Sequence, residues 1–213
     1  MKTQRTYYHL IVDRSGSMSD CAESAINGYN EQICRIRDLG LEFPEQDIRV
    51  GLTLFNEYPE LIYAGENATQ IPLLNRSNYV PMGGTALLDA IGKTILAIRG
   101  KEDDRPDLIP ATYVVVVLTD GYENSSRTFN LEQIRSMIKE REATGKWTFS
   151  FIGATLDAVD IAKEMAFQAH NSISFSKQEM KSEVWDNLSD SMSGYFYNKK
   201  NGGDIKKLFN KSK

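Results

Sequence analysis

Segments with the pattern of a β-strand alternate with helical segments along the whole chain of 213 residues. The clearest strand is "TYVVVVLTDG", residues 112–121, an uninterrupted β-branched run typical of a central parallel strand. We expect further strands at 6–13, 48–56, 59–65, 146–154 and 172–176, and helices at 20–40, 82–100, 130–145, 155–168 and 177–198. This order predicts an α/β fold: a doubly wound, mostly parallel central sheet with one antiparallel edge strand and helices on both faces.

Some element boundaries carry their own signals. The strand at 59–65 follows its predecessor closely enough to form a hairpin, and Pro59 suits an edge position because proline donates no hydrogen bond to a strand ladder. Asp20 with Glu23 three residues later resembles a capping box at the start of the first helix. Gly40 offers a left-handed stop at the end of that helix, and Gly145 closes the helix at 130–145.

Charge is distributed unevenly along the chain. The formal net charge is −4, and residues 199–213 contain six Lys and one Asp, so that residues 1–198 carry −9. We expect one folded domain over 1–198, followed by a basic, solvated and flexible tail at 199–213. The acidic body argues against nucleic acid as a partner, since phosphate binding requires a basic face. No apolar run approaches the roughly 20 residues of a membrane span, so no membrane partner is expected.

The start of the chain and its cysteines indicate a cytoplasmic protein. The opening "MKTQRTYYHLIVD" lacks the pattern of a secretory signal peptide. Cys21 and Cys34 fall on one expected helix, about 20 Å apart. A disulfide needs Cα atoms within about 7 Å, so we expect two reduced, partly buried thiols. The sequence does not indicate an oligomeric state.

An apolar strand runs directly into oxygen-bearing side chains in "HLIVDRSGSMSD", residues 9–20. Two further polar positions fall at the start of the helix at 82–100 and at the end of the strand at 112–121. The five candidate side chains are Asp13, Ser15, Ser17, Thr85 and Asp120. Because ligands bind at the carboxyl ends of parallel strands in open α/β sheets, we expect these groups to converge.

Carboxylates and hydroxyls suit a hard divalent cation. Mg²⁺ prefers six oxygen ligands at about 2.0–2.1 Å in an octahedral array, and Mn²⁺ suits the same kind of site. Zinc or copper would favour histidine or cysteine, but the chain has two histidines, His9 and His170, and neither lies in this cluster. The sequence therefore predicts a site for Mg²⁺, with Mn²⁺ as the alternative.

Three motifs resemble those of von Willebrand factor A (VWA) domains. "DRSGSMSD" is similar to the Asp-x-Ser-x-Ser signature of that family, "GGTALLDAI" to its threonine loop and "LTDGYEN" to its aspartate loop, in the family's order. The resemblance is closest to short intracellular bacterial or phage VWA proteins. It implies a metal ion-dependent adhesion site (MIDAS) in which Ser15, Ser17 and Thr85 are hydroxyl ligands. Asp13 and Asp120 would then contact the ion mostly through water.

The resemblance also implies that the ion accepts an exposed Asp or Glu carboxylate from a protein partner. The charges agree with this expectation, because neutral hydroxyls leave much of the dication's charge uncompensated. We therefore expect a non-catalytic, metal-dependent protein-binding module.

Other interpretations stay open from the sequence. The hydroxyl cluster is also typical of a helix N-cap. The chain is alternatively a structural or assembly subunit in which the metal only stabilises the loops. A metal-dependent phosphohydrolase is a further alternative, because "LIVD" also opens haloacid dehalogenase-type enzymes, although Ser15 stands where those enzymes have a second aspartate.

Several conspicuous residues are expected to be structural. Glu123 and Asn124 are interpreted as solvated turn residues beside Asp120, with a role in shaping the rim of the site as the alternative, and His9 and His170 as structural or solvated. An apolar stripe in the last helix has the spacing of a core-facing surface. It consists of Trp185, Leu188, Met192, Tyr195 and Phe196.

Overall fold

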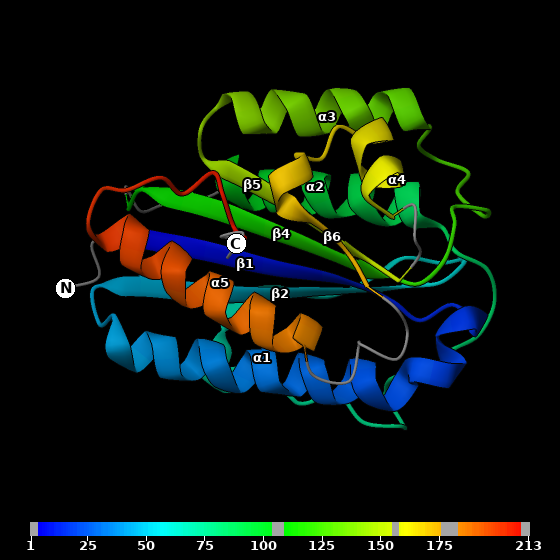
Figure 1. Cartoon of the computed structure of the whole chain (residues 1–213), viewed down its shortest axis with the longest axis horizontal. Coiled ribbons are helices and arrows are strands. Elements are labelled where there is room, and N and C mark those ends of the chain that lie inside the picture. The colour runs from blue at the N-terminus through cyan, green and yellow to red at the C-terminus, as the bar shows by residue number, and fades with distance from the viewer. Residues whose placement is uncertain (1–3, 104–108, 155–157, 176–182, 210–213) are drawn as a thin grey trace.

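The computed structural model describes residues 4–103, 109–154, 158–175 and 183–209 (Figure 1). Its strands are β1 (Gln4–Asp13), β2 (Gln46–Phe55), β3 (Glu60–Asn67), β4 (Ala111–Thr119), β5 (Trp147–Gly153) and β6 (Ser172–Ser174). Its α-helices are α1 (Ala22–Glu42), α2 (Leu87–Asp103), α3 (Leu131–Ala143), α4 (Ala158–Glu164) and α5 (Glu183–Lys200). Short 3₁₀ helices are η1 (Gly16–Cys21), η2 (Ala68–Gln70) and η3 (Ala169–Asn171).

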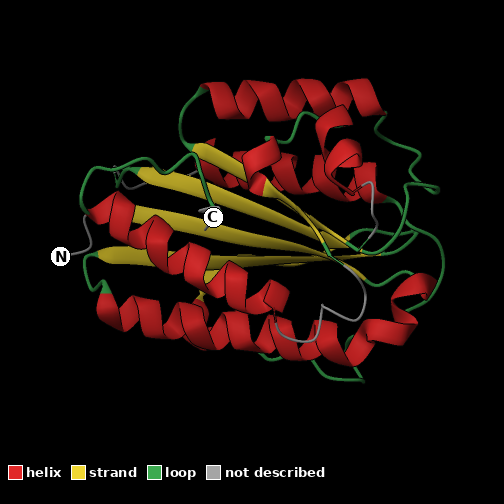
Figure 2. Cartoon of the chain, in the orientation of Figure 1, coloured by secondary structure: helices red, strands yellow, loops and turns green. Residues whose placement is uncertain are grey.

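The six described strands form one sheet in the order β3-β2-β1-β4-β5-β6. Strand β1 pairs in parallel with both β2 and β4, and β3 pairs antiparallel with β2 at the edge. Helices cover both faces of this sheet (Figure 2). The predicted fold class is therefore confirmed, including the single antiparallel edge strand among the described residues.

Two apolar cores lie on the two faces of the sheet. One contains side chains of α1 and α5, and the other contains side chains of α2, α3 and α4. In β4, Val114 and Val116 enter the first core while Val115 and Val117 enter the second, which explains its unbroken apolar run. Among the described residues, none of the helices has the length and apolar content needed to cross a membrane.

The apolar stripe of α5 is buried against the sheet and α1, which confirms the expected core-facing surface. Trp185, at the start of the stripe, is almost completely buried. A Cβ atom on Gly28 of α1 would lie only 1.8 Å from the Trp185 ring, so the glycine leaves the space that the indole fills. The Gln32 amide also donates to the Trp185 carbonyl at 2.9 Å. These contacts join two helices that are far apart in sequence.

The ends of α1 differ from the expected ones. Its N-cap is Cys21 and no side chain caps it, so the capping box expected from Asp20 is wrong: η1 already occupies those residues. The helix also continues past Gly40 to Glu42. It ends at Phe43, which precedes proline and is thereby excluded from helical backbone. A capping box is instead present on α3, where Asn130 and Gln133 cap each other's backbone.

The two thiols are both free, as expected, but they are not equally buried. Cys21 is buried and Cys34 is exposed on α1, so the expected partial burial of Cys34 is wrong. Helix α4 is shorter than expected, because Ala166 adopts a left-handed φ of 71° shortly after Glu164. The expected helical positions 155–157 and 177–182, and residues 210–213 of the expected tail, lie outside the described residues.

The described segment after α5 is largely exposed over residues 201–207, but its end is held in the core. Leu208 and Phe209 are buried in the core that α1 and α5 share. The Leu208 N–H donates to the Asn171 side-chain oxygen at 2.8 Å, and the Asn171 amide donates to the Lys206 carbonyl at 2.8 Å. Two apolar side chains and one asparagine therefore hold this basic segment on the sheet, as far as Phe209.

Candidate metal centre

Polar loops gather at the carboxyl-terminal edge of the sheet, on the right in Figure 1. Asp13 is the last residue of β1, and Asp120 directly follows β4, the parallel neighbour of β1. Thr85 lies two residues before α2. In the sheet, β2 lies on one side of β1 and β4 lies on its other side, so the direction of strand addition reverses at β1. Such a switch point is where open α/β sheets bind ligands.

Asp13 is buried and is held at both carboxylate oxygens. Its Oδ1 accepts a hydrogen bond from the Ser15 backbone N–H at 2.7 Å, and its Oδ2 accepts one from the Thr119 hydroxyl at 2.6 Å. The Tyr79 hydroxyl donates to the Asp13 backbone carbonyl. Burial raises the pKa of Asp13 to about 6, and the hydrogen bonds from Thr119 and Ser15 oppose this rise. The carboxylate is therefore fixed in orientation before any ligand binds.

Neighbouring side-chain oxygen atoms connect the loop after β1 with the loop after β4. The hydroxyls of Ser15 and Ser17 are 3.0 Å apart, and the Ser17 hydroxyl donates to Asp120 Oδ1 at 2.7 Å. Ser15 and Asp120 are buried, whereas Ser17 is exposed. The cluster is therefore open to solvent at Ser17.

Thr85 faces the same cluster across Gly121. A Cβ atom on Gly121 would lie 3.2 Å from the Thr85 hydroxyl and 3.3 Å from the Ser17 hydroxyl, so a side chain there would crowd the space beside both. The Thr85 backbone is clamped on both sides: its N–H donates to the Asn124 side chain at 2.8 Å, and its carbonyl accepts from the Asn124 N–H at 3.0 Å. All five predicted residues are thus brought to one edge.

Glu123 is partly buried and is not the solvated turn residue that we expected, whereas Asn124 is exposed, although its side chain accepts from the Thr85 N–H. Each oxygen of the Glu123 carboxylate accepts two hydrogen bonds, and one of the donors is the backbone N–H of Leu88 in the first turn of α2, at 2.9 Å. The others are the N–H groups of Ser125 and Ser126 and the hydroxyl of Ser126. Glu123 therefore ties the loop after β4 to the helix that follows Thr85.

Asp89 makes the reciprocal connection from α2. Its carboxylate accepts from the backbone N–H groups of Arg127, Thr128 and Phe129 at 2.8–3.1 Å. Burial opposes ionisation of Asp89, but these donors outweigh it and hold the pKa below its ordinary value. Sequence reasoning missed Asp89, Glu123 and Thr119, because their partners lie about 35–40 or more positions away.

The donor set at this edge fits a hard cation. It offers three hydroxyls and two carboxylates, the oxygen chemistry that Mg²⁺ and Mn²⁺ prefer. Within the described ranges, no group of three or more His, Cys, Asp or Glu side chains is placed to hold a metal. A site built from hydroxyls needs no such group; Thr85 is buried, Ser17 is exposed, and both hydroxyls lie beside Gly121.

His9 lies within the sheet and not in this cluster. It is buried, its Nε2 is 2.9 Å from the Thr53 hydroxyl, and burial lowers its pKa to about 3. A Cβ on Gly51 of the neighbouring strand would lie 2.0 Å from its ring, so His9 fills the space over that glycine. His9 is therefore a neutral structural residue, as expected.

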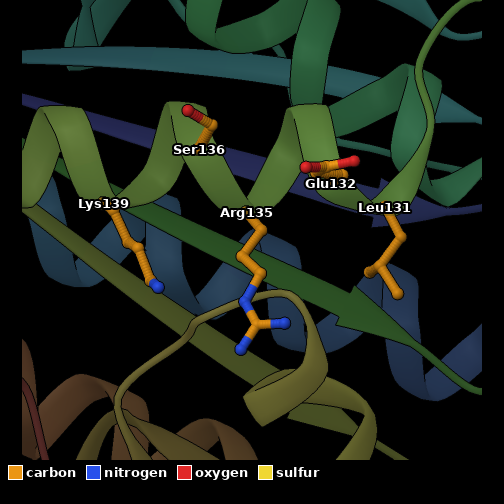
Figure 3. Close-up of a pocket in the computed structure, with 5 residues that line it drawn as sticks. All are labelled: Leu131, Glu132, Arg135, Ser136 and Lys139. Carbon is orange, nitrogen blue, oxygen red and sulfur yellow. The ribbon is translucent and has the colours of Figure 1, made fainter.

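A separate hollow of about 580 Å³ lies along α3 (Figure 3). Its described lining consists of Leu131, Glu132, Arg135, Ser136 and Lys139. Figure 3 shows Arg135 and Lys139 extending from the same side of the helix. None of the five candidate residues lines it, and we assign it no chemistry.

Comparison with known proteins finds structural rather than sequence similarity: no family model and no curated protein matches this chain. The von Willebrand factor domain of the type V pili tip protein Mfa5 from Porphyromonas gingivalis matches with a TM-score of 0.63 and 11% identity. This match covers 91% of the present chain and 96% of the other.

Two further structures from other bacteria are similar. The von Willebrand factor type A protein from Catenulispora acidiphila matches with a TM-score of 0.56 and 13% identity over 90% of this chain and 43% of that one. The PilB minor pilin from Streptococcus sanguinis matches with a TM-score of 0.58 and 13% identity over 89% and 61%. These two proteins are thus longer than the region they share with this chain. Taken with the strand order and the switch-point cluster, the matches show that this chain has the fold of a von Willebrand factor A domain.

Proposed function

We propose that this chain is a non-catalytic module that binds a protein partner through a divalent cation, Mg²⁺ or Mn²⁺. Three hydroxyls would ligate the ion and two carboxylates would hold those hydroxyls in place: Ser15, Ser17 and Thr85, with Asp13 and Asp120. The observation that carries the proposal is the position of the Ser17 hydroxyl. It donates to Asp120 at 2.7 Å and lies beside the same glycine as the Thr85 hydroxyl.

The balance of charge favours an acidic partner group. When bound, the cation supplies positive charge that neutral hydroxyl ligands leave largely uncompensated. The carboxylate of Asp13 is already engaged by Ser15 and Thr119, and that of Asp120 accepts from Ser17. An exposed Asp or Glu of a partner is therefore the ligand that would best complete the site, and it can approach where Ser17 is exposed.

The residues of the cluster do not favour hydrolysis. A hydroxyl at Ser15 cannot act as the general acid that a phosphohydrolase of the haloacid dehalogenase type needs at this position. His9 lies four residues before the end of β1, about 13 Å along the strand, and is bonded to Thr53. We therefore assign the cluster to binding and not to turnover.

The structural neighbours support a protein-binding role. Mfa5 is described as a pilus tip protein and PilB as a minor pilin, so both belong to protein assemblies. We extend to this chain only the general role of a domain that contacts another protein.

The direct test is recovery of partners with and without the ion. The immobilised chain is incubated with a lysate in Mg²⁺, eluted with EDTA, and each recovered protein is then purified and titrated against the chain. We expect Mg²⁺-dependent binding by wild type and its loss in Thr85→Ala. The matched control Thr69→Ala, in η2 and away from the cluster, should bind as wild type does.

Thermal melting under the same conditions separates the alternatives. If Mg²⁺ raises the melting temperature but the same proteins are recovered with Mg²⁺ and with EDTA, the ion is structural and the proposal is wrong. Turnover of a generic phosphoester that disappears in Asp13→Asn would contradict the non-catalytic assignment.

A further inference from the structure

Large apolar side chains are exposed around the candidate metal centre. In the described part of the chain, ten large hydrophobic residues are exposed, and four of them lie on the loops at this one edge. They are Tyr58, Val80, Met82 and Tyr122, with 69%, 51%, 60% and 56% of their surface exposed. Isolated exposed apolar residues are ordinary, but their concentration around one site is typical of an interaction surface.

Tyr122 and Met82 lie on two different sides of the cluster. Tyr122 directly follows Gly121, the glycine beside the Ser17 and Thr85 hydroxyls. The Met82 N–H donates to the carbonyl of Arg14, the residue after Asp13, at 2.9 Å. Apolar surface therefore flanks the hydroxyls next to both β4 and β1.

Val80 and Tyr58 extend the same surface. Val80 lines a hollow of about 400 Å³ together with Ser19 and Asp20 of η1, the helix that contains Ser17. Tyr58 follows β2, and its N–H donates to the Asn56 side chain at 2.9 Å. We call these four side chains the apolar rim.

Uncompensated negative charge lies beside the apolar rim. Glu57, next to Tyr58, is exposed, and among the described residues its carboxylate accepts only from the Gly84 N–H, at 3.2 Å. Within the described ranges, neither Glu57 nor the exposed Asp20 forms an ion pair, whereas the nearby cations are both paired: Arg14 with Glu60 at 2.9 Å, and Arg76, which lines the same hollow as Val80, with Glu23 at 2.6 Å. Outside the ion itself, the rim therefore repels acidic groups.

We propose that the partner presents a single Asp or Glu flanked by aliphatic or aromatic side chains, and not a run of acidic residues. This inference rests on the proposed function and specifies the partner of that site. One carboxylate reaches the ion, and the flanking side chains cover Tyr58, Met82 and Tyr122. A second acidic residue would meet Glu57 without a neutralising cation.

Two peptide libraries test the inference. Both have randomised positions on each side of a fixed central residue, which is Asp in one library and Asn in the other. Peptides are retained on the immobilised chain in Mg²⁺, eluted with EDTA and sequenced. We expect selective retention of the Asp library, with apolar residues enriched several-fold and acidic residues depleted at the flanking positions.

The outcomes distinguish this inference from the proposed function. Mg²⁺-dependent retention of the Asp library without apolar enrichment, or with acidic residues enriched, would overturn the inference and leave the proposed function standing. Equal retention of the Asp and Asn libraries would overturn both. Retention of apolar peptides regardless of Mg²⁺ would show that the rim binds independently of the ion, which also contradicts the inference.

Matched variants test the rim itself, using the most enriched peptide in a fluorescence-polarisation titration. Tyr58→Ser combined with Met82→Ser should weaken binding about tenfold or more while leaving Mg²⁺ affinity unchanged. The control combines Leu41→Ser and Tyr197→Ser, residues 81% and 64% exposed on other surfaces, and should bind within twofold of wild type. Equal losses in the two pairs, or no loss in the rim pair, would contradict the inference.

The charge component has its own pair of variants. Glu57→Gln should relax the depletion of acidic residues at the flanking positions, because it removes the repelling carboxylate. Glu31→Gln, at an exposed position in α1, should not. Unchanged depletion in Glu57→Gln would show that this residue does not select against acidic runs.

Discussion

The hydroxyl of Thr119, the last residue of β4, donates a hydrogen bond to the carboxylate of Asp13, the last residue of β1, at 2.6 Å. The same threonine oxygen accepts from the Gly121 N–H at 3.1 Å. One side chain therefore joins the aspartate of the first loop to the loop that contains Asp120. This bond fixes the relative positions of two parts of the candidate metal centre.

Replacing Thr119 by Val should weaken both the fold and the cation site. The substitution leaves Asp13 Oδ2 without its hydroxyl donor in a buried position, which typically costs about 1–3 kcal/mol. We expect this loss in urea unfolding, and weaker Mg²⁺ binding by calorimetry. Thr148→Val is the matched control, because it removes a buried hydroxyl that donates to the Ile205 carbonyl. That variant should lose stability but retain Mg²⁺ affinity; equal Mg²⁺ affinities in the two variants would contradict the role of Thr119.

Glu123→Gln should loosen the loop after β4. The glutamine has one acceptor oxygen in place of two, so some of the four donors that Glu123 satisfies lose their partner. We expect a loss of about 1–3 kcal/mol in unfolding free energy, and faster amide hydrogen exchange at Leu88 and Ser126. Glu31→Gln should change neither. Unaltered exchange at Leu88 would mean that the carboxylate does not hold the start of α2.

Gly121→Ala should reduce cation affinity without unfolding the chain. Its Cβ would lie 3.2–3.3 Å from the Thr85 and Ser17 hydroxyls, close enough to displace them. Gly40→Ala is the control, because its Cβ meets nothing within 4 Å and alanine favours a helix by up to about 1 kcal/mol. Titration with Mg²⁺ should show weaker binding only in Gly121→Ala. If Gly121→Ala binds Mg²⁺ as tightly as wild type, the space beside Gly121 is not part of the cation site.

Lys199 gives the fold a specific pH dependence. Its Nζ donates to the Arg5 carbonyl and to the hydroxyls of Thr6 and Thr112 at 2.7–2.9 Å, and burial lowers its pKa from 10.5 to about 7. Between these two values the unfolded chain binds a proton that the folded chain does not. The stability contributed by neutral Lys199 is therefore fully present above pH 10.5 and is lost as the pH falls towards 7.

The measurement is the difference in unfolding free energy between wild type and Lys199→Met at about pH 7.5 and about pH 9.5. Wild type should gain stability relative to the variant as the pH rises. Lys139→Met, at an exposed position on α3, should follow wild type. A relative loss of wild-type stability with rising pH would contradict the assignment.

The features that sequence could predict are those encoded locally or by order along the chain. The β-branched run of β4 and the alternation of elements indicate the parallel sheet, and the edge position of β3 follows from its short hairpin. Asp13 and Asp120 could be placed together because both follow neighbouring parallel strands. The location in the cytoplasm and the identity of the ion stay predictions.

The features that sequence missed depend on distant contacts. Glu123 resembles an ordinary turn residue until α2 places the Leu88 N–H against it. The segment ending at Phe209 resembles a charged tail, because its docking depends on Asn171 and the core under β6. Gly40 resembles a helix stop, but Pro44 decides where α1 ends.

The most direct test of the central claim is calorimetric titration of Mg²⁺ into wild type, Ser17→Ala and Ser19→Ala. The two serines lie two residues apart in η1, and the Ser19 hydroxyl donates to the Gly16 carbonyl at 2.7 Å and not to the cluster. We predict one Mg²⁺ per chain, unchanged affinity in Ser19→Ala, and affinity at least about tenfold weaker in Ser17→Ala. Wild type that binds no Mg²⁺ at millimolar concentration, or Ser17→Ala that binds it as tightly as wild type, would contradict the account.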